Sequence, residues 1–476
     1  MSTTTTTIAA SEEVTSPIAI PLATLPSTTS HRFRPAPSPS PSRSQPQASP
    51  PNPKTPLAKL LSASLSFLIA GLNDGALGAL LPYLLRSYTI TTALVTALYA
   101  ANLAGWLVAA LTATHLTQRA GLGGLLAAGA GLQALAHAVR CCWPGGPPWG
   151  VYVVSFWAVS LGQGWQDTGG NGFVAQLGVG EGAEGEDRKG KKGKGGGVAH
   201  RWLGFIHAMY MAGCLVAPFG AASIAAAGKV SRWWLFYTIP LGFGVVNLVF
   251  VLVAFRDSIS LWGGKKGKQQ PAGGEDTQEK RASGLIKAAL SQRAVWLLGL
   301  FFFFYLGSVM TAGGWVVEYL VEVRNGDIAQ MGYVPAGFSG GSLLGRILLP
   351  EPTHRFGEKR MVFLYCVLCV GLQLLFWLVP NIIAASVAIS LFGFFSGPLF
   401  ATAISVGAAL FPADINATAI SFVFVFSQIG GSLFPIVTGV LGAHVGVSVM
   451  QPILVGLLVA TTISWLLVPQ PKGKTK

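Results

Sequence analysis

The stretch LIAGLNDGALGALL at residues 68–81 places one acid, Asp74, inside a continuous apolar run. The stretch LGQGWQDTGGNGFVAQL at residues 161–177 does the same with Asp167. An apolar run of about 20 residues is long enough to cross a bilayer as a helix, and an ionised side chain at its centre costs about 2.5–3.5 kcal/mol on insertion scales. Because packing does not require that cost, we expect both acids to lie on a proton, ion or solute pathway.

The composition of the chain is that of a polytopic membrane protein. Of the 476 residues, 51% are hydrophobic and 11% are charged, whereas soluble domains carry about 25% charged residues. The basic residues behind the net charge of +14 lie in tails and in loops between apolar runs, which indicates membrane topology and not nucleic-acid binding. The five cysteines lie in or beside apolar segments and predict neither a disulfide framework nor a metal site.

Apolar runs recur from residue 60 onward and predict an all-α membrane protein with twelve transmembrane helices. The runs cover 60–82, 93–114, 121–139, 151–177, 201–226, 233–255, 294–320, 328–348, 361–379, 382–410, 415–441 and 446–468. Two inserts rich in glycine and charge, 178–197 and 263–284, predict mobile loops, and the second insert divides the helices six and six.

The expected domains are a disordered tail rich in Ser, Thr and Pro, a first six-helix half, a linker, a second six-helix half and a basic tail. In that order they cover 1–56, 57–256, 257–293, 294–470 and 471–476. With both termini in the cytoplasm, 27 of the 32 lysines and arginines fall on the cytoplasmic side, which is the bias that the positive-inside rule requires. This count treats Arg140 as a residue of an outer loop. The sequence does not distinguish a plasma membrane from a vacuolar membrane.

A faint internal repeat supports the division into halves. Residues 117–121 read TQRAG and residues 353–357 read THRFG, so the pattern T-x-R-x-G recurs 236 residues later. Both copies fall between the second and third predicted helix of a half. Parallel halves of this kind are typical of one class of secondary transporter.

These features make the chain resemble major facilitator superfamily transporters over nearly all of residues 57–470. The resemblance implies a fold of two six-helix halves, with a solute site between them. It also implies a conformational loop signature, made here of Arg119, Gly121, Arg346, Arg355, Gly357 and Arg360. In the first copy of that signature Gln118 stands where the family has an acid.

Four strings are similar to the fungal fucose-permease-like branch of that family: NDGALGALLPY, QDTGGN, GGWVVEYLVEVRNG and IGGSLFP. This resemblance implies proton-coupled sugar uptake, with Asp74 and Asp167 in the places of the acids that the branch carries on helices 1 and 4. Fungal relatives often carry a further acid in helix 7, where this chain has Val309. We therefore expect no acid at mid-membrane in the second half.

Polar residues at helical spacing accompany the two acids. One face of the fourth predicted helix carries Gln163, Gln166, Asp167, Gly170 and Asn171. Such a face must meet the helix bundle or a wet cavity, because lipid cannot satisfy it. Two interpretations stay open for Asp167, a proton carrier or a neutral acid bonded to a neighbour. Asn73 and Asp74 likewise either bind solute hydroxyls or form a structural hydrogen bond.

Four other residues are candidates for solute binding: His207, Trp315, Asn102 and Gln428. Trp315 follows two glycines, so its ring is available either to a sugar face or to a membrane interface. The others are candidates for ordinary interhelical hydrogen bonds as well.

The sequence predicts a secondary active transporter of a small polar, sugar-like solute, coupled to protons and working as a monomer in the lipid bilayer. No nucleotide-binding or catalytic motif is present, so we expect neither an enzyme nor a cofactor. One alternative is a proton-antiport exporter, because Gly204, Gly213 and Ala217-Pro218 approximate the helix 5 signature of antiporters. A further alternative is a non-transporting sensor on the same fold.

Overall fold

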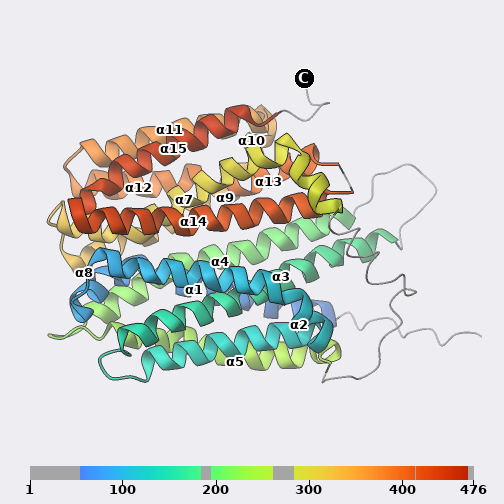
Figure 1. Cartoon of the computed structure of the whole chain (residues 1–476), viewed down its shortest axis with the longest axis horizontal. Helices are drawn as coiled ribbons and strands as arrows, with labels where there is room; N and C mark the ends of the chain where they lie inside the picture. Colours follow the sequence, from blue (N-terminus) through green and yellow to red (C-terminus); the bar gives the residue numbers. More distant parts are fainter. Residues whose placement is uncertain (1–53, 184–194, 261–283, 413, 470–476) are drawn as a thin grey trace, which may run out of the picture. The chain divides into compact units, whose positions relative to one another are not determined.

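The computed structural model describes residues 54–183, 195–260, 284–412 and 414–469, which lie in one compact unit, Asn52–Lys476. These residues form helices joined by short loops (Figure 1). The helices of the first part are α1 (Lys54–Tyr88), α2 (Thr92–Cys141), α3 (Trp149–Ala183), α4 (Gly195–Ala226), η1 (Trp233–Tyr237), α5 (Thr238–Ala254) and η2 (Arg256–Ser258). Those of the second part are α7 (Arg293–Glu322), α8 (Ile328–Met331), α9 (Val334–Leu348), α10 (Pro350–Phe356), α11 (Glu358–Leu378), α12 (Ile382–Ser396), α13 (Leu399–Leu410), α14 (Asn416–Val445), η3 (Val447–Val449) and α15 (Met450–Leu467). The predicted tails and the two predicted inserts lie wholly or mostly outside the described residues.

Within the described ranges, nine helical segments are long and apolar enough to cross a membrane. Each predicted apolar run coincides with one helix or with two consecutive short ones. The single helix α2 contains two of the runs, 93–114 and 121–139, because the chain continues through a break at Gly121. The count of twelve spans, the cytoplasmic termini and the domain boundaries stay predictions.

The two copies of T-x-R-x-G have the same local structure. Gly121 interrupts α2 with a φ of 74°, and Gly357 separates α10 from α11 with a φ of 98°. Only glycine adopts such angles without strain. The hydroxyls of Thr117 and Thr353 each donate to the carbonyl four residues earlier, at 2.7 Å and 2.6 Å. The faint sequence repeat is therefore a repeat of backbone geometry.

The helices pack in two groups, shown in Figure 1 in blue to green and in yellow to red. In the first helix group, α1 to α5, α1 packs along α4, and α2 packs against α3 and α5. In the second helix group, α7 to α15, α7 packs along α14 and α15, and α12 packs against α9 and α11. The two groups meet where α2 packs on α14, α4 on α9, and α1 on α7.

The two ends of the bundle differ in how the groups meet. We call the end where α1 ends and α2 begins the turn end, and the end where α1 begins and α15 ends the tail end. At the turn end the groups share one hydrophobic core, in which Tyr99 and Trp315 are both buried. Toward the tail end each group has a core of its own, with Phe67 in the first group and Phe301 and Trp465 in the second. The groups are thus joined through apolar packing mainly at the turn end.

One ion pair ties the first helix group at the tail end. The Lys59 ammonium lies 2.6 Å from Asp257, which follows α5. Partial burial acts to raise the pKa of the Asp257 carboxyl, but hydrogen bonds from Lys59 and Ser258 outweigh it and hold that pKa below its ordinary value of 3.8. Because the Asp257 side chain is 57% exposed, solvent screening leaves this pair a weak contribution to stability.

Candidate functional site

The carboxylate of Asp74 accepts hydrogen bonds from residues of three helices. Asn73 Nδ2 lies 2.9 Å from Oδ1, Gln163 Nε2 of α3 lies 3.3 Å from the same oxygen, and Tyr210 OH of α4 lies 3.0 Å from Oδ2. Asp74 is half-buried, whereas Asn73 and Gln163 are almost fully buried. The sequence grouped Gln163 with Asp167 on the fourth predicted helix and did not single out Tyr210, whereas the structure brings both into contact with Asp74.

Glycines bring α1 close enough to α4 for these bonds. A Cβ atom added to Gly71 would lie under 3.0 Å from the backbone of Tyr210, and one added to Gly75 would lie 2.6 Å from Cα of Cys214. From the other side, a Cβ on Gly213 would meet the backbone of Leu68. The absence of side chains lets the two backbones touch, as in other closely packed membrane helices.

Arg140 extends the site to α2. Its Nη1 donates to Oδ1 of Asn73 at 2.7 Å, and its Nε donates to the hydroxyl of Ser155 at 2.7 Å. The guanidinium is fully buried and lies 4.0 Å from the ring centre of Phe156 and 4.8 Å from that of Tyr237. Contacts of a cation with ring faces compensate part of its desolvation.

The assignment of Arg140 to an outer loop is therefore wrong. The helix α2 continues to Cys141 and carries this cation inward instead of into the solvent. Through Asn73, Arg140 orients the amide that donates to Asp74. We call Asn73, Asp74, Arg140, Gln163 and Tyr210 the Asp74 network.

Asp167 has a different environment, although it lies on the same helix as Gln163. It is half-buried, and Asn171, one turn further along α3, donates a hydrogen bond to it. The Oδ1 atom of Asn171 has no partner among the described residues. Asp167 and Asn171 thus form a small polar pair with acceptor positions left free, apart from the Asp74 network.

Gln166 points away from both acids, toward α2. Its Oε1 accepts from Gln133 Nε2 at 2.7 Å, and its Nε2 donates to the carbonyl of Leu126 at 3.2 Å. Both glutamine side chains are almost fully buried. The polar face predicted for the fourth helix is therefore divided, with Gln163 on the side of α1 and Gln166 in the contact between α2 and α3.

The remaining solute-binding candidates lie apart from one another. Trp315 is 1% exposed, stacks on Tyr99 with ring centres 6.4 Å apart and donates to the carbonyl of Pro435 at 3.2 Å. Its ring is thus committed to the contact between α7, α14 and α2. Asn102 accepts from the hydroxyl of Ser160 at 2.5 Å.

His207 lies between the two helix groups. Its ring is 5.3 Å from that of Phe67 and 6.5 Å from that of Phe400 of the second group. Arg346 also acts on His207 electrostatically. Gln428 is half-buried in α14. Of these candidates, His207 has the position that faces both groups on the side of the tail end.

The residues of the predicted loop signature occupy two kinds of position. Arg119, Arg355 and Arg360 are exposed at the breaks of the helices. Arg346 instead lies in the last turn of α9, is half-buried, and is close enough to Cys214 and His207 to act on both electrostatically. It thus faces the first helix group and not a loop.

The described residues contain no group of three or more His, Cys, Asp or Glu side chains that could hold a metal ion. What the Asp74 network offers is a set of amide, hydroxyl and carboxylate groups in the middle of an apolar bundle. Such groups exchange hydrogen bonds with hydroxyls, and a carboxyl beside them can take up a proton.

Comparison with known proteins agrees with this architecture. A family model described as "Major Facilitator Superfamily" matches residues 63–435 and 353–476. "Bypass of stop codon protein 6" of Saccharomyces cerevisiae is 28% identical over 442 residues, which cover 87% of this chain and 83% of the yeast protein.

Two solved structures have the same fold at low identity. The E. coli fucose:proton symporter FucP is 18% identical, with a TM-score of 0.57 over 87% of this chain and 99% of that chain. A D-xylose-proton symporter is 13% identical, with a TM-score of 0.63 over 88% and 99%.

Proposed function

Because the chain belongs to the Major Facilitator Superfamily, we propose that this multi-pass membrane protein cotransports a small, sugar-like solute with protons. The observation that carries the proposal is the Asp74 network. A sugar presents several hydroxyls, each a donor and an acceptor, and the network presents groups of both kinds on three adjacent helices. The relatives with a similar fold include symporters of fucose and of D-xylose, which supports this solute class.

The two acids have different roles in the proposal. The Asp74 carboxylate already accepts three hydrogen bonds, so only one of its about four acceptor positions is left for a proton. Asp167 accepts one bond, from its own helix, and can gain or lose a proton without disturbing the network. We therefore assign Asp167 as the proton carrier and Asp74, with Asn73 and Gln163, as the solute-binding group.

The packing of the helix groups supports alternating access. The shared core closes the turn end, where Thr92 of α2 also donates to the carbonyl of Gly439 of α14 at 2.9 Å. Toward the tail end the cores are separate, and the acids are half-buried. Under the predicted orientation the tail end is cytoplasmic, so this state is the one that exchanges solute with the cytoplasm. Rocking of the two groups about the fixed site gives the other state.

The test is uptake into proteoliposomes that contain the purified full chain. L-fucose and D-xylose are offered at an external pH one unit below the internal pH, and accumulation above equilibrium is measured. We expect Asp167→Asn to abolish accumulation while exchange of labelled for unlabelled solute continues. Asp257→Asn, which removes an exposed acid at the tail end, is the control and should accumulate solute normally. An Asp167→Asn variant that concentrates solute as the wild type does would contradict the proton role.

Export by proton antiport rested on the glycine pattern of the fifth predicted helix. Gly213 of that pattern lies against the backbone of α1, so helix packing accounts for it without reference to the direction of transport. Counterflow measured from each side of the membrane separates uptake from export.

A further inference from the structure

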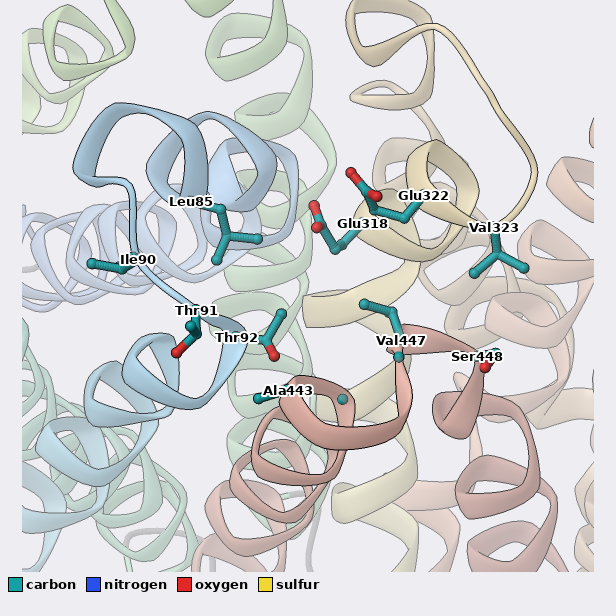
Figure 2. Close-up of a pocket in the computed structure, with 12 residues that line it drawn as sticks. Leu85, Ile90, Thr91, Thr92, Glu318, Glu322, Val323, Ala443, Val447 and Ser448 are labelled. Atoms are coloured by element: carbon teal, nitrogen blue, oxygen red, sulfur yellow. The ribbon is translucent and has the colours of Figure 1, made fainter.

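A second site lies at the turn end, where the two helix groups meet. A pocket of about 480 Å³ is lined by the end of α1, the start of α2, the end of α7 and the segment that joins α14 to α15. Figure 2 shows Glu318 and Glu322 on its α7 wall, with both carboxylates turned toward the side of Leu85. The volume lies within the range of about 300–1,000 Å³ typical of small-molecule sites.

Glu318 is the unexpected member of this wall. The side chain is 6% exposed, and no hydrogen bond or ion pair within 4.0 Å reaches it from the residues that the structure describes. Arg86 of α1 acts on it electrostatically, and so does Glu322 with the opposite sign. The carboxylate oxygens of Glu318 are not among the enclosed unpartnered atoms of the described residues, so they open onto the pocket. A ligand of the pocket can therefore reach them and supply the hydrogen-bond partner that the protein does not.

The rest of the pocket favours a cation with an apolar part. The helices α7 and α14 end here and α2 begins here, so the partial negative charges of two carboxyl ends face the partial positive charge of one amino end. The two glutamates supply the formal negative charge. Between these groups the walls are apolar, with Leu85, Ile90 and Val447 among the lining residues. A calcium ion needs six to eight oxygens at about 2.3–2.6 Å, which a wide, partly apolar pocket with two glutamates does not provide.

We propose that this pocket binds a small organic ammonium ion, with its charge on Glu318 and Glu322 and its alkyl part against the apolar wall. The inference does not depend on the transported solute or on the role of Asp167. Because the lining comes from both helix groups, a bound cation contacts both and favours the closed turn end.

The experiment measures binding of n-butylammonium to the purified full chain by thermal shift at constant ionic strength. Sodium chloride and 1-butanol are the matched probes, the first with charge alone and the second with the alkyl part alone. We expect only n-butylammonium to raise the melting temperature in a saturable manner. Glu318→Gln and Glu322→Gln should each weaken its binding at least tenfold, whereas Glu351→Gln, which changes an exposed acid of α10, should not.

The same titration also reports on the helix groups. With a cysteine in place of Thr96, which is 8% exposed at the closed turn end, saturating n-butylammonium should slow thiol alkylation in the wild-type pocket and not in Glu318→Gln. An equal shift with sodium chloride or with 1-butanol overturns the proposal. Undiminished affinity for n-butylammonium in both glutamate variants overturns it as well. So does the absence of n-butylammonium binding to the wild type.

Discussion

Replacing Gly78 by alanine should open the turn end without unfolding the protein. A Cβ atom at Gly78 of α1 would lie under 3.0 Å from the carbonyl oxygen of Gly313 of α7, so the two helices must move apart to accept it. Overpacking of this kind costs about 1–3 kcal/mol. Because α1 and α7 belong to different helix groups and meet in the shared core, that cost falls on the closed state. We expect the population of the open state to rise about 5- to 150-fold.

The measurement is the alkylation rate of a cysteine introduced at Thr96, in a background where the five native cysteines are replaced. Thr96 is buried in the contact between α2 and α14, so its rate of alkylation follows the open population. Gly313→Ala is the matched control, because it lies at the same crossing and a Cβ there meets nothing within 4 Å. Both substitutions replace glycine by alanine within a helix and gain the same helix propensity, about 1 kcal/mol. The difference between their alkylation rates therefore reports the steric clash at Gly78.

Equal alkylation rates in Gly78→Ala and Gly313→Ala would refute the reasoning. So would a faster rate in Gly78→Ala that is accompanied by a broad, low melting transition, since it would report unfolding and not opening. A faster rate with an intact melting transition is the expected result.

Three further predictions concern other contacts. Arg140→Lys keeps the charge but cannot make both hydrogen bonds of the guanidinium, so chemical denaturation should show a loss of about 1.5–3 kcal/mol together with weaker solute binding. Gln166→Leu should lower the free energy of unfolding by about 1–3 kcal/mol, because it leaves Gln133 buried without its partner. The double variant with Gln133→Leu should recover most of that stability. Neither variant should alter solute uptake. Asp257→Asn should lower the free energy of unfolding by less than about 1 kcal/mol at neutral pH. Because Lys59 lowers the folded-state pKa of Asp257, the ion pair stabilises the protein above the unfolded-state pKa. The difference in stability between wild type and variant should vanish as the pH falls through the folded-state pKa, which is below 3.8.

The sequence was sufficient to predict the family and the apolar runs. It was also sufficient to single out Asp74, because an acid inside an apolar run can be recognised without knowing which helices pack together. Asn73 is adjacent to that acid in the sequence, but the sequence grouped Gln163 with Asp167 and did not predict its hydrogen bond to Asp74. It was wrong about Arg140, which stands next to CCWPGGPP and has the appearance of a loop cation. Only the rings of Phe156 in α3 and Tyr237 in η1 that surround the guanidinium reveal its burial, and both belong to other helices than Arg140.

Other side chains show the same limit. Helical spacing puts Gln166 on one face with Gln163, but it does not say which neighbour covers each edge of that face. Trp315 follows two glycines, yet its ring packs on Tyr99, a residue 216 positions earlier. Glu318 lies near Glu322 at the end of an apolar run, where an acid ordinarily meets water, and the sequence does not show that it is buried.

All donors to Asp74, and the arginine behind them, belong to α1, α2, α3 and α4. Under the proposed alternating access, a network confined to one helix group keeps its geometry whichever end of the bundle is closed. Its intrinsic affinity for solute should therefore be similar on the two sides of the membrane. In the proposed carrier, as in any secondary transporter, the gradients across the membrane set the direction of net flux, and the network does not favour either side.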